Sequence, residues 1–242
     1  MVQTQLKYHK IFLLVLFFVT GLHRVCAQTP YENLQFDLLT CSPGTQVYEL
    51  YGHTALRATD GKGLDVVFNY GVFDFKKPHF VWNFVLGKTD HMVQPVPFDI
   101  FMMEYEHRGS SVTAQRINLT ESEAQQLMRS LMDNVLPENR EYRYNSLTNN
   151  CTTKVRDMIE RAIDGEVKYP KFEKKTYREF MHQYTDGHPW AELGNDMLLG
   201  ASVDTILTDR KSAFLPERLM KFYDEAVVYD LEGNSKPLLI GK

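Results

Sequence analysis

Residues 149–165 open with Asn149-Asn150-Cys151-Thr152-Thr153 and end at Gly165, and apolar side chains recur between them at positions 155, 158, 159 and 162. This spacing of three and four residues predicts an amphipathic helix with one buried stripe, and a glycine is a natural stop for it. A helix that begins at Asn149 or Asn150 places Cys151 in its first turn. Free amides and the positive end of the helix dipole stabilise a thiolate there, so we predict a nucleophilic cysteine. The alternative is a buried structural cysteine.

Strand patterns lie on the N-terminal side of this helix. They cover residues 34–41, a segment centred on Thr54-Ala55-Leu56-Arg57, and residues 64–73, 88–94 and 111–119. The turn Asp60-Gly61-Lys62-Gly63 joins the second and third of these strands into a hairpin.

Helical patterns lie between and after the strands. They cover residues 79–86, 98–106 and a segment from the capping box Thr120-Glu121-Ser122-Glu123 to about Val135, and shorter helices and loops are expected over 176–240. Strands and helices that interleave without strict alternation are typical of the α+β class. We therefore predict an α+β fold in which an antiparallel sheet packs against the helix that carries Cys151.

The N-terminus has the pattern of an export signal. Lys7, His9 and Lys10 precede an apolar run over 11–19, and Val25-Cys26-Ala27 supplies small residues before the next position. This pattern predicts a signal peptide over 1–27 that is cleaved after Ala27, with an uncleaved anchor as the alternative. The run is shorter than the roughly 20 residues of a membrane span. Residues 28–242 are expected to form one periplasmic domain, with a core over about 34–165 and a helical C-terminal extension over about 176–242.

Charge and residue spacing argue against several functional classes. The net charge is −4 with both signs scattered along the chain, so there is no basic block for nucleic acid. No pair of histidines has a spacing typical of a metal site, and no metal or cofactor is predicted. Without the signal peptide, Cys41 and Cys151 are the cysteines that remain. In an oxidising compartment they can form one disulfide, and a noncatalytic binding protein stapled by that bridge is the alternative to catalysis.

His53 is the candidate base for the thiol. It follows Gly52 and starts a predicted strand, where a histidine is rigidly held and can reach a thiol on a neighbouring helix. A third group must orient the imidazole, and the hairpin register selects it. A four-residue loop places His53 opposite Tyr70, and a loop one residue shorter places it opposite Asn69. We prefer Asn69, because its amide oxygen accepts the imidazole proton and stays neutral, although both residues can be ordinary strand positions.

A set of short motifs spreads over most of the chain after the signal. They are Leu38-Leu39-Thr40-Cys41-Ser42-Pro43-Gly44, Tyr51-Gly52-His53-Thr54-Ala55-Leu56-Arg57, Phe68-Asn69-Tyr70-Gly71, Asn118-Leu119-Thr120, Asn149-Asn150-Cys151-Thr152-Thr153 and Phe214-Leu215-Pro216. Together they resemble the Lnb N-terminal periplasmic domain family over roughly 34–220. The resemblance implies a circularly permuted papain-like (NlpC-type) thiol enzyme, in which histidine precedes cysteine. It carries Cys151 over as the nucleophile, His53 as the base, and Asn69 by its place on the following strand.

The same resemblance implies an activity. The family takes its name from a lipoprotein N-acyltransferase of Gram-negative bacteria, so the expected reaction moves a fatty acyl group from a phospholipid donor, through a Cys151 thioester, to the N-terminal amine of a lipoprotein acceptor. A thioester conserves the reactivity of the ester, and the reaction then needs no cofactor. Such an enzyme works at a membrane surface, and Met102-Met103 and residues 79–84 are candidates for an acyl groove or a membrane contact, or for core packing.

Two further expectations stay open at this point. A cysteine peptidase or amidase that acts on peptidoglycan would use the same Cys151 and His53, so only the groove and the acceptor would distinguish it. The resemblance also implies a membrane-embedded half after this domain in the full acyltransferase. Because the sequence ends at Lys242 without such a span, we expect either a fragment or a stand-alone relative with a different substrate.

Overall fold

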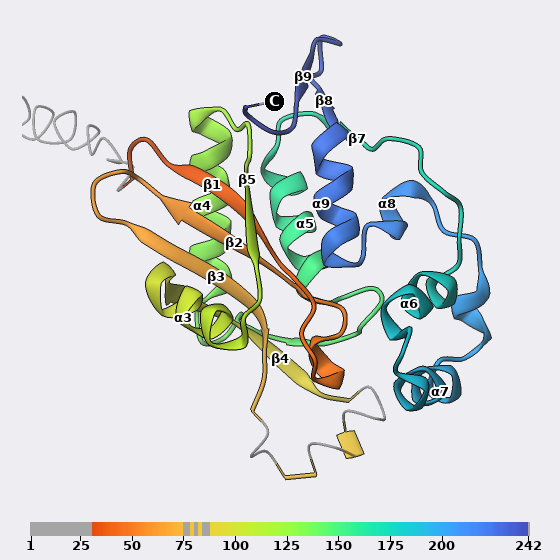
Figure 1. Cartoon of the computed structure of the whole chain (residues 1–242). Helices are drawn as coiled ribbons and strands as arrows, with labels where there is room; N and C mark the ends of the chain where they lie inside the picture. Colours follow the sequence, from red (N-terminus) through yellow and green to blue (C-terminus); the bar gives the residue numbers. More distant parts are fainter. Residues whose placement is uncertain (1–30, 75–77, 80–81, 84–87, 242) are drawn as a thin grey trace, which may run out of the picture. The chain divides into compact units, whose positions relative to one another are not determined.

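A six-stranded antiparallel sheet forms the centre of the described part of the chain (Figure 1). The computed structural model describes residues 31–74, 78–79, 82–83 and 88–241. The strands follow the order β5-β1-β2-β3-β4-β6 across the sheet. Their bounds are Gln35–Cys41 (β1), His53–Thr59 (β2), Asp65–Val72 (β3), Asp90–Pro97 (β4), Val112–Arg116 (β5) and Glu141–Arg143 (β6).

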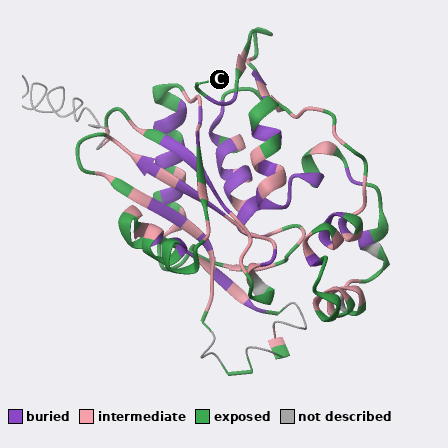
Figure 2. Cartoon of the chain, viewed as in Figure 1, coloured by how far each residue is buried: buried purple, intermediate pink, exposed green. Residues whose placement is uncertain are grey.

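Helices cover both faces of this sheet. Successive side chains of a strand point to opposite faces, so alternate positions form two separate apolar surfaces. On one face, α3 (Phe98–Arg108) contributes Phe101 and Tyr105 to a buried cluster with Leu39, Cys41, Ala55 and Val67. On the other face lie α4 (Glu121–Asn134), α5 (Cys151–Ala162) and α9 (Pro216–Glu225), and α5 packs against β2 and β3. Figure 2 shows the buried residues concentrated in the strands and in these helices.

The hairpin between β2 and β3 has a longer loop than the sequence predicts. Asp60 accepts hydrogen bonds from the amides of Lys62 and Leu64, at 2.7 and 2.9 Å, and the first strand pair is Thr59 with Asp65. The loop therefore holds the five residues 60–64. The pairs of β2 with β3 run from Thr59–Asp65 to Leu56–Phe68, and if this register continued to the start of β2, His53 would lie opposite Gly71. Both predicted alignments of His53, with Asn69 and with Tyr70, are wrong.

The C-terminal part is helical, as predicted, but it also contributes strands. Its helices are α6 (Tyr177–Thr185), α7 (Pro189–Leu198), η2 (Ala201–Asp204), α8 (Asp209–Ser212) and α9. A second antiparallel sheet of β7 (Glu166–Lys168), β8 (Val227–Tyr229) and β9 (Ser235–Pro237) was not predicted, nor was β6. Gly165 is required by this sheet, because a Cβ on it would lie 2.3 Å from the carbonyl oxygen of Tyr229.

Most of the other strands and helices predicted from the sequence are present in the structure. The strands over 34–41, 64–73 and 111–119 and the helices after Pro97, Thr120 and Asn150 are present, with ends that move by a few residues. The strand near 88–94 runs over Asp90–Pro97, and a short 3-10 helix, η1 (Val47–Glu49), precedes β2. Most of the helix predicted over 79–86, and the signal peptide over 1–27, lie outside the described residues. Among the described helices, none has the length and apolarity to cross a membrane.

Glu123 ties three elements together. As the third residue of α4, it accepts a hydrogen bond from the amide of Thr120 at 2.7 Å and so completes the predicted capping box. The same buried carboxylate accepts from the amide of Asp164, after α5, at 3.0 Å, and from Lys236 of β9 at 3.0 Å. Loss of one partner in such a group leaves the others buried and unpaired.

We predict that Glu123→Ala lowers the free energy of unfolding by about 3 kcal/mol, because a buried charge and its three donors lose their partners. Urea denaturation of the purified chain measures this change. Glu121→Ala is the matched control, since Glu121 is exposed in the same helical turn and its loss should cost less than about 1 kcal/mol. Equal effects of the two substitutions would contradict the assigned role of Glu123.

Candidate active site

The start of α5 is fixed by Asn150. Its side-chain oxygen accepts a hydrogen bond from the amide of Thr153 at 2.8 Å, and the Thr153 hydroxyl accepts one from the amide of Asn150. The Asn150 amide group also donates to the carbonyl oxygens of Ser146 and Phe214, at 2.7 and 3.0 Å. Asn150 is therefore both the N-cap of α5 and a link to two loops. It places Cys151 at the first helical position, as predicted.

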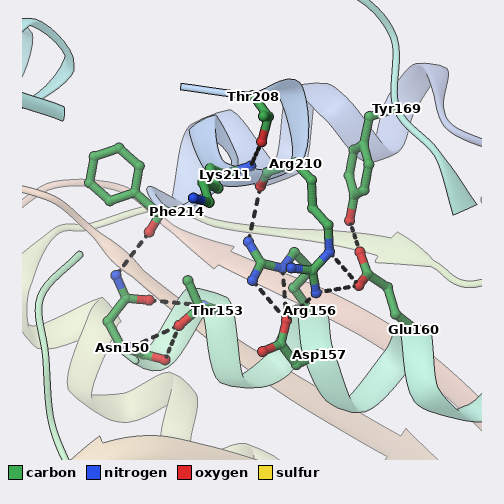
Figure 3. Close-up of polar contacts among 10 residues, drawn as sticks. All are labelled: Asn150, Thr153, Arg156, Asp157, Glu160, Tyr169, Thr208, Arg210, Lys211 and Phe214. Carbon is green, nitrogen blue, oxygen red and sulfur yellow. Dashed lines mark hydrogen bonds and ion pairs between the residues drawn. The ribbon is translucent and has the colours of Figure 1, made fainter. Parts of the chain in front are cut away.

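A polar network connects the same helix to the C-terminal segment (Figure 3). The buried Arg156 donates to the side chain of Asp157 and to the carbonyl oxygen of Arg210, at 2.7 and 3.1 Å. Arg210 of α8 in turn pairs with Asp157 and with Glu160, which also bonds to the hydroxyl of Tyr169. Residues 156–160 of α5 are thus tied to the C-terminal segment, which limits movement of the helix that carries Cys151.

His53 stands at the first position of β2, beside the start of α5. Gly52, which precedes it, has φ +71°, and a Cβ there would lie 2.6 Å from the carbonyl oxygen of Cys41. Only glycine meets both conditions, so the Gly-His pair lets β2 start against the end of β1. One residue further, the Thr54 hydroxyl is 3.0 Å from that of Thr152, and both groups are fully buried.

Asn69 is a hydrogen-bond partner of His53. Its side-chain oxygen lies 2.7 Å from Nε2 of His53. Because an amide oxygen only accepts, Nε2 carries the proton, and Nδ1 is the ring nitrogen left for the thiol. The side chain of Tyr70 points to the sheet face opposite to that of Asn69, where its hydroxyl donates to Asn134 of α4 at 2.7 Å. The preference for Asn69 over Tyr70 thus agrees with the geometry, although the register argument that led to it was wrong.

The environment of Cys151 favours its thiolate. The side chain is 8% exposed and hydrogen-bonds to His53 and to the backbone amide of Thr54. Burial raises the pKa of the thiol. The charge and hydrogen bond of His53, with the Thr54 amide and the Thr152 hydroxyl, lower this pKa by more than burial raises it, so the result is about 7. Burial lowers the pKa of His53, while the charge and hydrogen bond of Cys151 and the bond to Asn69 raise it above its ordinary value. Each group stabilises the charged form of the other.

Two neighbours of the sulfur were not predicted. The hydroxyl of Tyr144 hydrogen-bonds to Cys151, and burial and the negative charge of the sulfur raise the pKa of Tyr144 well above its ordinary value, so it stays protonated. Its ring stacks on that of His91, with centroids 4.0 Å apart. Gly71 has φ +94°, and a Cβ on it would lie 3.6 Å from Cβ of Cys151 and 3.7 Å from Cε2 of Tyr144. Gly71 ends the motif Phe68-Asn69-Tyr70-Gly71, which the sequence resemblance includes, whereas no local sequence pattern indicates a role for Tyr144.

Cys41 is a separate, buried thiol. Both Cys41 and Cys151 are free. Burial raises the pKa of Cys41 to about 12, although a hydrogen bond with Tyr105 of α3 opposes this shift. The structure thus gives no support to the alternative of a noncatalytic binding protein with a Cys41–Cys151 disulfide. Within the described ranges, no group of three or more metal-ligating side chains is arranged to hold a metal ion.

The chain matches the model of a known protein family. A family model described as the Lnb N-terminal periplasmic domain matches residues 23–186, about two thirds of the chain. The chain belongs to this family. No curated protein and no solved structure matches it significantly. The Lnb match includes Cys151, His53 and Asn69 and ends between α6 and α7, and its description assigns the domain to the periplasm.

The pKa values predict how this Lnb-family site responds to pH. Alkylation of Cys151 by iodoacetamide should slow as the pH falls through about 7, because the thiolate is then protonated. In His53→Ala the main group that lowers this pKa is gone, and at pH 7 alkylation should fall at least about tenfold. Peptide mass spectrometry measures the rates, and the buried Cys41 is an internal control that stays unmodified. An unchanged pH profile in His53→Ala would contradict the ion pair.

Tyr144 should position the thiolate through its hydroxyl. Tyr144→Phe keeps the ring stack on His91 but removes the donor, so the pKa of Cys151 should rise and alkylation at pH 7 should slow by roughly tenfold. Tyr142→Phe is the control, because the Tyr142 hydroxyl makes no hydrogen bond to Cys151 in the described structure. If both variants keep the wild-type pH profile, Tyr144 only packs against the site.

Proposed function

We propose that this protein is a periplasmic thiol acyltransferase. The observation that carries the proposal is the hydrogen-bonded series Cys151, His53 and Asn69 at the N-terminus of α5. A nucleophile, a base within reach and a third group that orients the base are the parts that acyl transfer through a thioester requires. The lowered pKa of Cys151 supports the same role, because the thiolate is the reactive form.

We further propose that the fold is a circularly permuted papain-like (NlpC-type) fold. The support is the arrangement of a cysteine at a helix start and a histidine on an antiparallel strand, with an amide behind the histidine. The histidine precedes the cysteine in the chain, which is the order that the permutation implies. The predicted signal peptide and the family's periplasmic description support export to that compartment.

In the first step the Cys151 thiolate attacks the ester carbonyl carbon of a phospholipid. A carbon–sulfur bond forms, and the tetrahedral oxyanion lies near the first-turn amides of α5, which are the natural donors to it. Collapse of the oxyanion breaks the carbon–oxygen bond of the ester. The leaving alkoxide takes the proton of the His53 imidazolium and departs as a lysophospholipid, which leaves an acyl thioester on Cys151.

In the second step an amine replaces the sulfur. The N-terminal amine of a lipoprotein attacks the thioester carbon, His53 accepts the amine proton, and the carbon–sulfur bond breaks. The acyl amide leaves, and the thiolate and imidazolium pair is restored. Asn69 acts as a positioning residue throughout, because its bond to Nε2 keeps Nδ1 directed at the reacting atoms.

The proposal predicts a covalent intermediate. Wild-type protein exposed to phospholipid vesicles without an amine acceptor should gain the mass of one fatty acyl group, and hydroxylamine should remove it. Intact-mass spectrometry measures the gain. Cys151→Ala should show none, while Cys41→Ala, the matched control at the other thiol, should show the wild-type adduct.

The other outcomes have distinct meanings. No adduct, together with cleavage of a peptidoglycan peptide that depends on Cys151, would replace the proposal with the cysteine amidase. A mass two hydrogens below the reduced chain would mean a Cys41–Cys151 disulfide and would overturn the enzyme reading.

A further inference from the structure

The loop that joins β6 to α5 is closed by its own hydrogen bonds. The backbone amides of Asn145 and Asn149 each donate to the carbonyl oxygen of the other residue, at 3.2 and 3.0 Å. The side-chain oxygen of Asn145 also accepts from the amides of residues 147 and 148, both at 3.0 Å. Tyr144 stands just before this loop and Cys151 just after it, so the loop fixes the position of one relative to the other.

The side chain of Tyr144 is held on several sides. Its ring stacks on the buried ring of His91, with centroids 4.0 Å apart, and its backbone amide donates to the carbonyl oxygen of Thr89 at 3.2 Å. Its hydroxyl hydrogen-bonds to the sulfur of Cys151. Gly71 lies against both residues and has no side chain to fill the space beside them. The hydroxyl is therefore a fixed donor at the reacting sulfur.

A buried hydroxyl needs an acceptor at every stage of a reaction, because an unpaired buried donor is destabilising. Before attack, the acceptor of the Tyr144 hydroxyl is the thiolate. Once the sulfur is bonded to an acyl carbon, it has lost its negative charge and accepts hydrogen bonds only weakly. The charge then lies on the acyl oxygen, which is bonded to the same carbon as the sulfur. One hydroxyl can therefore reach first the sulfur and then the oxygen.

One amide in the first turn of α5 is already occupied. The side-chain oxygen of Asn150 accepts from the amide of Thr153 at 2.8 Å. An oxyanion has more than one lone pair, so it accepts from another amide of this turn and from a second donor at the same time. Tyr144 approaches the sulfur from the residue after β6, outside α5, and is placed to supply that second donor.

We propose that the hydroxyl of Tyr144 is a catalytic oxyanion donor. As the Cys151 thiolate forms the carbon–sulfur bond, the π electrons of the carbonyl group move to its oxygen, and the hydrogen bond of Tyr144 passes from the sulfur to that oxygen. When the oxyanion collapses, the carbonyl double bond forms again and the ester carbon–oxygen bond breaks. Tyr144 keeps its proton throughout. A donor that follows the charge to the oxygen stabilises the transition state.

The inference deepens the proposed function and rests on it for the thioester chemistry. It assigns Tyr144 a part in the reaction itself, in addition to its effect on the ionisation of Cys151. It does not depend on which ester or amide supplies the acyl group, since each forms an oxyanion when the thiolate attacks.

Two small reagents separate these effects. Iodoacetamide alkylates the thiolate at a saturated carbon and forms no oxyanion, whereas p-nitrophenyl acetate acylates it through a tetrahedral oxyanion. The nitrophenolate leaves as an anion and needs no proton from His53. The pKa of Cys151 is about 7. At about pH 9.5 the thiol is therefore ionised in the wild type, and it stays mostly ionised even if the pKa rises by about one unit in Tyr144→Phe.

We predict that Tyr144→Phe slows acylation by p-nitrophenyl acetate at about pH 9.5 by about 100-fold, while alkylation changes by less than about threefold. The burst of nitrophenolate and the intact mass measure acylation, and peptide mass spectrometry measures alkylation of Cys151. Preserved alkylation also shows that the variant keeps a folded site with an accessible thiol.

Tyr142→Phe is the matched control. The ring of Tyr142 lies beside that of Tyr144, with centroids 6.4 Å apart, but its hydroxyl makes no hydrogen bond to Cys151 in the described structure. Both rates should stay within about threefold of the wild-type values.

Three results would overturn the inference. If acylation falls no more than alkylation in Tyr144→Phe, the residue acts only on the thiol. If Tyr142→Phe loses as much acylation as Tyr144→Phe, the cause is a general disturbance of packing. If the wild type is alkylated but not acylated, the site gives an oxyanion no stabilisation.

Failure of the proposed function has a different signature. Phospholipid vesicles would then give no thioester on Cys151, while acylation by p-nitrophenyl acetate would still depend on Tyr144. In that case the phospholipid donor is wrong and the oxyanion role of Tyr144 stands.

Discussion

The junction between the start of β2 and the start of α5 is the constraint on which the site depends. The buried Thr54 and Thr152 hydroxyls join segments 98 residues apart, and one position earlier in each segment stand His53 and Cys151. The cap at Asn150, the network of Arg156 and the glycine before His53 all act on this junction. A small movement of α5 would break the thiol–imidazole bond, which explains why so many polar groups fix its first turns.

Much of this arrangement could be predicted from local patterns. The N-cap at Asn150, the capping box at Thr120 and the alternation of the strands are short-range signals, and each is present in the structure. The hairpin register was wrong because the side chain of Asp60 organises a five-residue loop, an effect that the turn sequence alone did not reveal. Asn69 was still the better choice, because its side-chain oxygen lies 2.7 Å from Nε2 of His53, whereas the Tyr70 hydroxyl donates to Asn134 of α4.

Other features depend on contacts that no local pattern contains. Tyr144 reaches Cys151 only because β6 pairs with β4 and brings residues 141–143 beside the sheet. The small sheet of β7, β8 and β9 joins segments that are about 60 residues apart, and each of its strands has three residues, too few for a periodic signal. The exposure of Trp190, Leu193 and Met197 on α7 also escapes prediction, because a sequence pattern gives the spacing of apolar residues but not the face that meets the core.

Burial of the thiol has opposite effects on activation and on the lifetime of an intermediate. It opposes ionisation of Cys151, and the charge of His53 overcomes this opposition, so the pair stays reactive near neutral pH. The same burial keeps water away from a thioester on the sulfur, which in the proposed reaction must survive until an amine arrives. An exposed thiolate would ionise with less help but would leave its thioester open to hydrolysis. A buried thiol–imidazole pair therefore suits transfer to an amine better than hydrolysis.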